Sequence, residues 1–310
     1  MEKEAIVKKL LSLGVMATPD VIDRIEKSGL DAYLGNISKG SCMVVQEGSG
    51  TDDAISCRVG QVSAKAEMTP DDFVQAIADK FKRIRDLLLR KMDAVSISNM
   101  SRISSKLSVV GMVKEKTGQG FVLEDGTGEV EVKSATPVRL DDVIGVRGWI
   151  RDGKLFGEEI VYPDIPVNRP IHSMKGKLLL VGNAAGAKGG ADVVVSPYAA
   201  SDGSGAEKSL PNPAWITLEK GDNSMTVVVY KPERLAVKND ALGWLAKRYI
   251  GTDGVPVPGG DRVLETIPDI LWIVSENEPW SGNYKGVTLI SFGQRNQALI
   301  DLNTRKIDIR

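Results

Sequence analysis

The chain has 310 residues, of which 42% are hydrophobic and 26% charged, and this length predicts about two or three domains. Forty basic and 41 acidic residues leave a formal charge of -1, so no global charge draws the chain to nucleic acid or to a membrane. One histidine, His172, and two cysteines, Cys42 and Cys57, exclude a histidine-rich metal hydrolase and a disulfide-framed secreted domain.

The first part of the chain predicts a small helical module followed by a linker. Apolar residues fall at helical spacing within residues 1–34, where charged and apolar groups alternate too closely for a signal peptide. No apolar run approaches the roughly 18 residues of a membrane span, which favours a cytoplasmic protein. Residues 35–68 are rich in Gly, Ser and Asp, which predicts a flexible linker with one or two short strands. Both cysteines lie there, and we interpret them as free thiols without a redox role.

Residues 69–103 predict a helical connector. Thr69 is a helix cap, and a single apolar stripe follows, formed by Phe73, Ile77, Phe81, Ile84 and Leu88. Six basic residues and one acidic residue lie between Lys80 and Met92. A basic helix can contact phosphates, so Lys80 and Arg83 are candidate contacts to a partner or to DNA. A solvated helix face is the alternative interpretation, and we favour it.

Residues 104–166 predict a small barrel of the OB type. Five short strands with a period of two are separated by Gly and Asp turns, and Gly111 stands where the first strand must bend. Ten acidic and seven basic residues between Lys114 and Glu159 give this region a local charge of -3. An interaction or structural barrel is therefore favoured over one that binds single strands. The aromatic residues Trp149 and Phe156, and Trp280 further along the chain, are candidate partner contacts.

Residues 167–310 predict a β-sandwich. Seven apolar strand candidates and one helix around residues 240–249 favour two facing sheets over a doubly wound sheet. The segments together therefore predict an α+β multidomain protein.

Parts of this region resemble two kinds of catalytic motif, but neither motif is complete. Gly182, Gly186 and Lys188 have the wrong spacing for a phosphate-binding loop, and Gly189 stands where such a loop carries a hydroxyl. His172 lies in a connector, and the chain has no Gly-x-Ser-x-Gly turn, so we interpret this histidine as structural. A magnesium site built from carboxylates alone stays open, because Asp and Glu are plentiful.

Taken in order, several segments resemble one known family. The helix FVQAIADKFKRIRDLLLRKM, the strand SVVGMVKE, LPNPAWITLEKGDNSMTVVVYKP and GNYKGVTLISFGQRNQALIDLNTRKIDI carry the resemblance. They are similar to the small subunit of archaeal D-family DNA polymerase and, more distantly, to the B subunits of eukaryotic replicative polymerases. The resemblance runs through most of the chain.

The resemblance implies that residues 167–310 form a calcineurin-like phosphoesterase domain, which in the archaeal polymerase is a 3′–5′ exonuclease with a pair of metal ions. The family's ligand motifs do not survive here. Their positions are occupied by Gly182, Ala184, Lys231, Ser275 and Asn277. Without the histidines and carboxylates of those motifs, no metal site and no cofactor is expected.

The resemblance therefore implies a non-catalytic scaffold or regulatory partner of a DNA polymerase large (catalytic) subunit, which meets DNA through that complex and no membrane. Two alternatives stay open. One is a protein that binds single-stranded DNA through its OB barrel, and the other is a residual metal-dependent 3′–5′ exonuclease.

Overall fold

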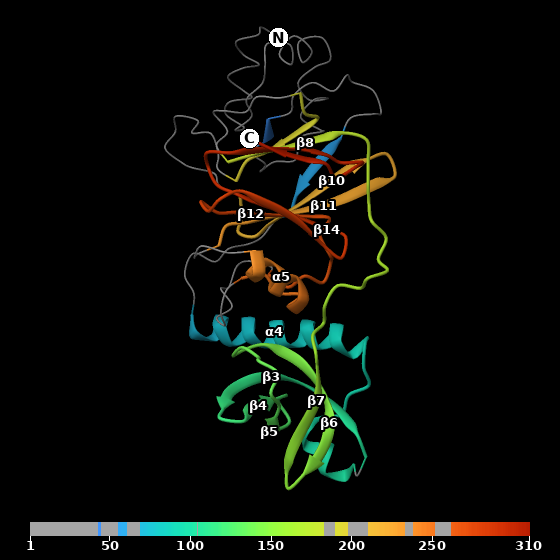
Figure 1. The fold of residues 1–310 in the computed structure, drawn as a ribbon, viewed down its shortest axis with the longest axis vertical. Coiled ribbons are helices and arrows are strands. Elements are labelled where there is room, and N and C mark those ends of the chain that lie inside the picture. Colours follow the sequence, from blue (N-terminus) through green and yellow to red (C-terminus); the bar gives the residue numbers. More distant parts are fainter. Residues whose placement is uncertain are drawn as a thin grey trace. The chain divides into compact units, whose positions relative to one another are not determined.

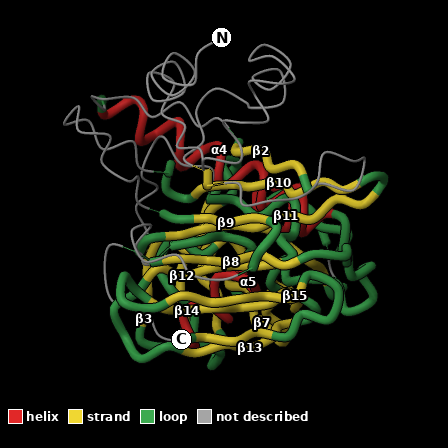
Figure 2. The backbone as a smooth tube through the Cα atoms, turned by 90° about the horizontal axis from the view of Figure 1, so that it is seen from above, coloured by secondary structure: helices red, strands yellow, loops and turns green. Residues whose placement is uncertain are grey.

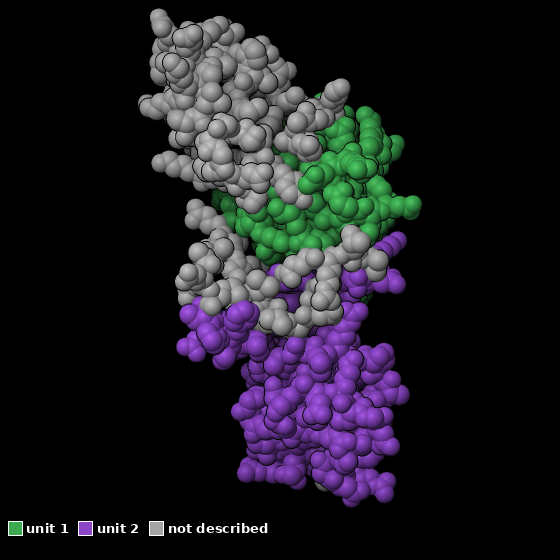
Figure 3. All heavy atoms as spheres, turned by 90° about the vertical axis from the view of Figure 1, so that its left-hand side faces the viewer, with its two compact units in different colours: residues 1–62, 168–236, 268–310 green, residues 63–167, 237–267 purple. Residues whose placement is uncertain are grey.

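A computed structural model describes residues 55–60, 69–103, 105–182, 190–197, 210–232, 238–251 and 262–310, and the backbone of residues 43–44. The helical module expected over residues 1–34 lies outside these ranges. The chain divides into two compact units (Figure 3). Unit 1 comprises residues 1–62, 168–236 and 268–310, and unit 2 comprises residues 63–167 and 237–267. Among the described residues, no helix is long and apolar enough to cross a membrane.

Unit 2 begins with the predicted helix, α4 (Pro70–Leu89), which is followed by the 3-10 helix η1 (Ile97–Arg102). The start of α4 is fixed by a capping box. Thr69 Oγ1 accepts a hydrogen bond from the Asp72 amide at 3.3 Å, and an Asp72 carboxylate oxygen accepts one from the Thr69 amide at 2.9 Å. The carboxyl-terminal half of the apolar stripe is buried, with Ile84 and Leu88 in one cluster and Phe81 packed against it. The stripe therefore attaches the helix to the rest of unit 2.

The remainder of unit 2 is built around a closed barrel of five strands, as the sequence predicts (Figure 1). Its strands follow the order β3-β4-β5-β7-β6, and β6 closes onto β3. Gly111 in β3 allows a close approach of β4, because a Cβ at this position would lie 2.6 Å from the Leu123 side chain. The strands are β3 (Leu107–Thr117), β4 (Gly120–Glu124), β5 (Glu129–Lys133), β6 (Val143–Arg151) and β7 (Lys154–Val161).

Unit 1 contains two sheets. The first has the order β1-β9-β8-β15-β16, and the second has the order β13-β14-β12-β11-β10-β2; Figure 2 shows their strands in yellow. Strands β11, β12 and β14 run parallel to one another. The first sheet comprises β1 (Met43–Val44), β8 (Lys177–Val181), β9 (Val193–Val195), β15 (Gln297–Asp301) and β16 (Ile307–Ile309). The second comprises β2 (Ser56–Val59), β10 (Ala214–Lys220), β11 (Asn223–Tyr230), β12 (Ile270–Val274), β13 (Trp280–Tyr284) and β14 (Val287–Phe292).

One hydrophobic core lies between these two sheets. Leu178, Leu180 and Val193 from the first sheet share a buried cluster with Val227 and Trp272 from the second. The ring of Trp272 stacks on Phe292, with centroids 4.7 Å apart. The two sheets therefore face each other, in agreement with the predicted sandwich.

Two segments pack with parts of the chain that are distant in sequence. Residues 35–68, where the sequence predicts a linker with one or two short strands, contain β1 and β2, and β2 pairs antiparallel with β10. Residues 237–267 belong to unit 2, although they lie within the range 167–310 that predicts the sandwich. This segment contains the helix α5 (Lys238–Lys247), and its Tyr249 and Val263 pack in the cluster of α4. Long-range packing, which local composition does not reveal, sets both boundaries.

We predict that the α4 stripe is essential for unit 2. Leu88 is fully buried, and its neighbour Leu89 is 36% exposed. Leu88→Ala should lower the free energy of unfolding by about 2–5 kcal/mol because it leaves a cavity. Leu89→Ala, the matched control, should change it by about 0.5 kcal/mol or less. Urea unfolding followed by circular dichroism measures both changes, and equal midpoints for the two variants would contradict this packing.

Candidate functional site

The first candidate site is the carboxyl edge of the strands in unit 1, where open sheets commonly bind ligands. Gly182 follows β8, Lys231 follows β11, Ser275 follows β12 and Gly293 follows β14. We call these four positions, together with Glu276 and Gln294, the strand-end edge. Three of the positions expected to have lost metal ligands, Gly182, Lys231 and Ser275, therefore follow directly on strands, and Asn277 lies two residues beyond Ser275. Ala184 lies outside the described residues.

Backbone atoms fill the space beside Gly182. A Cβ on Gly182 would overlap the carbonyl oxygen of Gly293, and it would lie 2.6 Å from the Cα of Gln294. The Glu276 carboxylate in turn lies against Gly293 and accepts a hydrogen bond from the Gln294 amide at 3.0 Å. The loop after β14 therefore lies directly against the end of β8. The family resemblance singled out Ser275 and Asn277, but nothing in the sequence indicated that Glu276 would bind this loop.

Lys231 places a positive charge at the end of β11. Its amide donates to Asn212 Oδ1 at 2.8 Å, and its Nζ donates to the Pro197 carbonyl at 3.2 Å. A bound metal ion near this ammonium would be repelled by it. Among the residues that the structure describes, no group of three or more His, Cys, Asp or Glu side chains could hold a metal ion.

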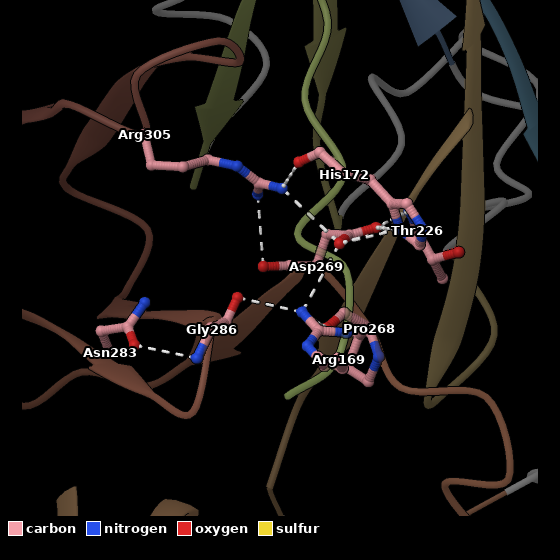
Figure 4. A network of polar contacts seen from close by, with 8 residues as sticks. All are labelled: Arg169, His172, Thr226, Pro268, Asp269, Asn283, Gly286 and Arg305. Atoms are coloured by element: carbon pink, nitrogen blue, oxygen red, sulfur yellow. Dashed lines mark hydrogen bonds and ion pairs between the residues drawn. The ribbon is translucent and has the colours of Figure 1, made fainter. Parts of the chain in front are cut away.

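A second polar cluster, at the opposite end of β12, surrounds Asp269 (Figure 4). Asp269 is 1% exposed, and its carboxylate lies 3.5 Å from the Arg169 guanidinium and 3.6 Å from that of Arg305. It also accepts a hydrogen bond from the Thr226 amide at 2.9 Å and lies 3.2 Å from His172 Nδ1. The carboxylate is thus surrounded by structural partners. This arrangement supports the structural interpretation of His172.

The two basic candidates on α4, Lys80 and Arg83, both have partners within unit 2. Lys80 is only 5% exposed; its Nζ donates to the Asp141 carbonyl at 2.8 Å and lies 4.4 Å from the centroid of the Tyr249 ring. Burial lowers the pKa of Lys80, although the nearby carboxylates of Asp141 and Asp142 oppose that shift. Its position, three residues after Ile77 and four before Ile84, places it beside the buried stripe. Lys80 therefore does not belong to the exposed polar face of α4.

Arg83 already has two acidic neighbours within unit 2. Its Nε lies 2.9 Å from Glu265 Oε1, and its Nη1 lies 3.3 Å from Asp79 Oδ2. The hydrogen bond from Arg83 is the main cause that lowers the pKa of Glu265. This guanidinium links α4 to the segment that contains α5.

The aromatic candidates lie in different surroundings. Trp149 on β6 and Phe156 on β7 are directly paired across the two strands, and their rings stack with centroids 6.2 Å apart and planes at 7°. Trp149 is 43% exposed, so this aromatic pair is accessible on the barrel. Trp280 is half-buried in β13, an edge strand of the second sheet of unit 1. Among the candidate contacts, the aromatic pair thus contains the most exposed side chain, that of Trp149.

Comparison with known proteins relates the chain to one class, the small subunits of archaeal DNA polymerases. It is 26% identical over 174 residues to the DNA polymerase II small subunit of Archaeoglobus fulgidus, which covers 46% of this chain and 34% of that protein. It is 22% identical over 191 residues to the DNA polymerase II small subunit of Thermoplasma acidophilum, covering 54% of this chain and 39% of that protein. No protein-family profile matches the chain. The chain thus spans well under half the length of these relatives.

We predict that the Cys57 thiol is unreactive in the folded protein. Cys57 lies on β2 and packs against the sandwich core, and burial raises its pKa to about 12. At pH 8 the thiol therefore stays protonated, and its alkylation by iodoacetamide should be at least about 100-fold slower than in urea. A Cys42→Ser background isolates this one thiol, and mass spectrometry measures the rate. Equal rates in the folded and unfolded chain would contradict the burial of Cys57.

Proposed function

We propose that this protein is a non-catalytic, polymerase small-subunit-like scaffold that binds a DNA polymerase large subunit. The proposal rests on the similarity to archaeal polymerase small subunits, together with one structural observation. That observation is the strand-end edge, where the Gly293 backbone lies against Gly182 and the Lys231 ammonium lies at the end of β11. The residues that fill this edge fit a structural role better than a catalytic one.

In this proposal the barrel of unit 2 is of the OB type, and the sandwich of unit 1 is a degenerate calcineurin-like phosphoesterase domain. The closed order β3-β4-β5-β7-β6 and the parallel strands β11, β12 and β14 support these assignments. The segment of residues 237–267 belongs to the barrel unit, so the proposed phosphoesterase domain consists of unit 1 alone.

The physical case against metal-dependent catalysis comes from the donor atoms at the strand-end edge. A two-metal hydrolase needs several convergent oxygen and nitrogen ligands to hold its ions about 3.5–4 Å apart. Gly182 offers no side-chain donor, Lys231 offers a cation, and the Glu276 carboxylate is already hydrogen-bonded to the Gln294 amide. Of the edge residues, only Glu276 brings a carboxylate.

The aromatic pair is the surface that we propose for the contact with the large subunit. Trp residues dominate the free energy of many protein interfaces, because a large flat ring buries much apolar area at a low cost in side-chain entropy. The Trp149 ring stacks on Phe156, and Arg147, two residues earlier on β6, lies 2.8 Å from Glu159. An apolar centre with a charged rim is typical of an interface that forms and separates. DNA would be reached through the complex.

A second candidate function, binding of single-stranded DNA, is favoured by one feature of the barrel. A groove of about 830 Å³ is lined by Lys116, Lys133 and Phe156, and the described residues that line it include no acidic side chain. However, Lys133 Nζ lies 2.5 Å from Glu131, so part of this positive charge is already compensated. The barrel as a whole carries more acidic than basic residues, and we therefore favour the scaffold.

Co-expression with the large subunits of the host polymerases, followed by size-exclusion chromatography, tests the proposal. We expect co-elution with one of them, and Trp149→Ala should weaken that complex at least tenfold, by about 1.4 kcal/mol or more. The control is Val74→Ala, which shortens an exposed apolar side chain in the first half of α4. It should leave the affinity unchanged.

One outcome would count against the scaffold, and another would count against the interface proposed for it. Separate elution from every large subunit, together with salt-sensitive binding of single-stranded DNA by the isolated chain, would favour the second candidate. Equal affinity of the Trp149→Ala variant and the wild type would keep the complex but remove the aromatic pair from its interface.

A further inference from the structure

A second cavity in unit 2, of about 470 Å³, is lined by four cationic side chains. Its lining residues come from α4, the end of β3, the loop between β5 and β6, and α5; Figure 1 labels these helices and strands. Its volume is within the range of small-ligand sites, which begins at about 300 Å³. The charged side chains that line it are Lys80, Lys116, Arg139, Lys247, Asp142 and Asp240.

The two carboxylates of this cavity already have cationic or hydrogen-bonding partners. Asp142 lies 2.6 Å from Lys247 Nζ and accepts hydrogen bonds from the Arg139 amide at 3.0 Å and the Tyr162 hydroxyl at 3.4 Å. Asp240 lies 3.9 Å from the Arg139 guanidinium. Four cations against two carboxylates leave two positive charges in the lining, and the Asp141 carboxylate outside the lining also acts on Lys80. The lining therefore keeps a positive excess that favours an anion.

Lys80 supplies the buried donor of the cavity. Its ammonium has three N–H groups. Among the described residues, the Asp141 carbonyl accepts one of them and the Tyr249 ring faces the ammonium. A buried ammonium is costly unless its charge is paired, and burial lowers the pKa of this lysine. An anion in the cavity would pair with that charge and oppose the lowering of the pKa.

We propose that this cavity binds a phosphate group, with Lys80, Lys116 and Arg139 as its ligands. Phosphate carries about two negative charges near neutral pH and three strong acceptor oxygens. The guanidinium of Arg139 can bind two of these oxygens at once, and the lysines act as point charges. This site does not depend on the scaffold function.

Two sources of the phosphate group are compatible with the geometry. One is a free anion such as pyrophosphate. The other is the terminal phosphate of a nucleic-acid strand, because Lys116, Pro137 and Val138 line both this cavity and the barrel groove. The chemistry of recognition is the same in the two cases.

Isothermal titration calorimetry on the full chain tests the site, with pyrophosphate as the first probe. A 5′-phosphorylated oligothymidylate and its unphosphorylated counterpart are the second and third. The Lys116→Ala/Arg139→Ala variant removes two cations whose side chains are exposed, so folding should be unaffected. We expect it to weaken binding of the phosphate probes at least tenfold. The matched control, Lys82→Ala/Arg85→Ala, removes the same charge from exposed positions on α4 outside the cavity and should bind as the wild type does.

Each outcome of the titration supports or overturns the site. Binding of pyrophosphate supports a free anion as the source, and a preference for the 5′-phosphorylated strand over its counterpart supports a strand end. Absence of binding by both phosphate probes at millimolar concentration would overturn the proposal. An equal loss of binding in the two double variants would also overturn the proposal, because net charge alone would then account for the attraction of the anion.

Discussion

The buried carboxylate of Asp269 is the interaction on which the order of unit 1 depends. A charge removed from water must be paired, and here the partners come from distant parts of the chain: Arg169 and His172 from the connector, Thr226 from β11 and Arg305 from the carboxyl-terminal turn. Arg169 and Arg305 also donate to backbone carbonyls, at Gly286 and at Asp269 itself. Breaking a buried pair of this kind costs about 3–5 kcal/mol, because the remaining charge stays buried. The cluster therefore fixes one end of the sandwich.

This fixed end has a consequence for the opposite end of the same strands. Asp269 precedes β12 and Ser275 follows it, so the charge cluster and the strand-end edge lie at the two ends of one strand. In many metalloenzymes the metal contributes to the stability of its domain. Here the Asp269 cluster, the shared core of the two sheets and the contact of Glu276 with Gln294 hold the sandwich. These contacts hold the sandwich together without requiring a metal ion at that edge.

The elements that the sequence predicts well are those with a local physical signature. The capping box at Thr69 marked the start of α4, the period of two marked the barrel strands, and long apolar runs marked the central strands of the sandwich. The positions of Gly182, Lys231 and Ser275 were singled out by the family resemblance, and the structure places each of them directly after a strand. These predictions needed no knowledge of the packing between elements.

The features that the sequence did not predict all depend on contacts between distant residues. Composition predicted one or two short strands in the tract that contains β2, but not that β2 would pair with β10. Strand β13 (Trp280–Tyr284) consists largely of weak strand formers that pair with β14. Lys80 looked like one of several surface cations, but Tyr249 and Asp141 enclose it. The contact of Glu276 with the loop at Gly293 likewise joins two segments whose proximity is set by the sheet.

An exonuclease assay tests the central claim, that the strand-end edge has no catalytic metal site, most directly. The purified protein is incubated with manganese and a 3′-labelled single strand, and release of the label is followed against a reaction with chelator. The account predicts no release above the chelator reaction, and no saturable manganese binding by calorimetry. Metal-dependent release that persists through repurification and is lost in the Glu276→Gln variant would contradict it.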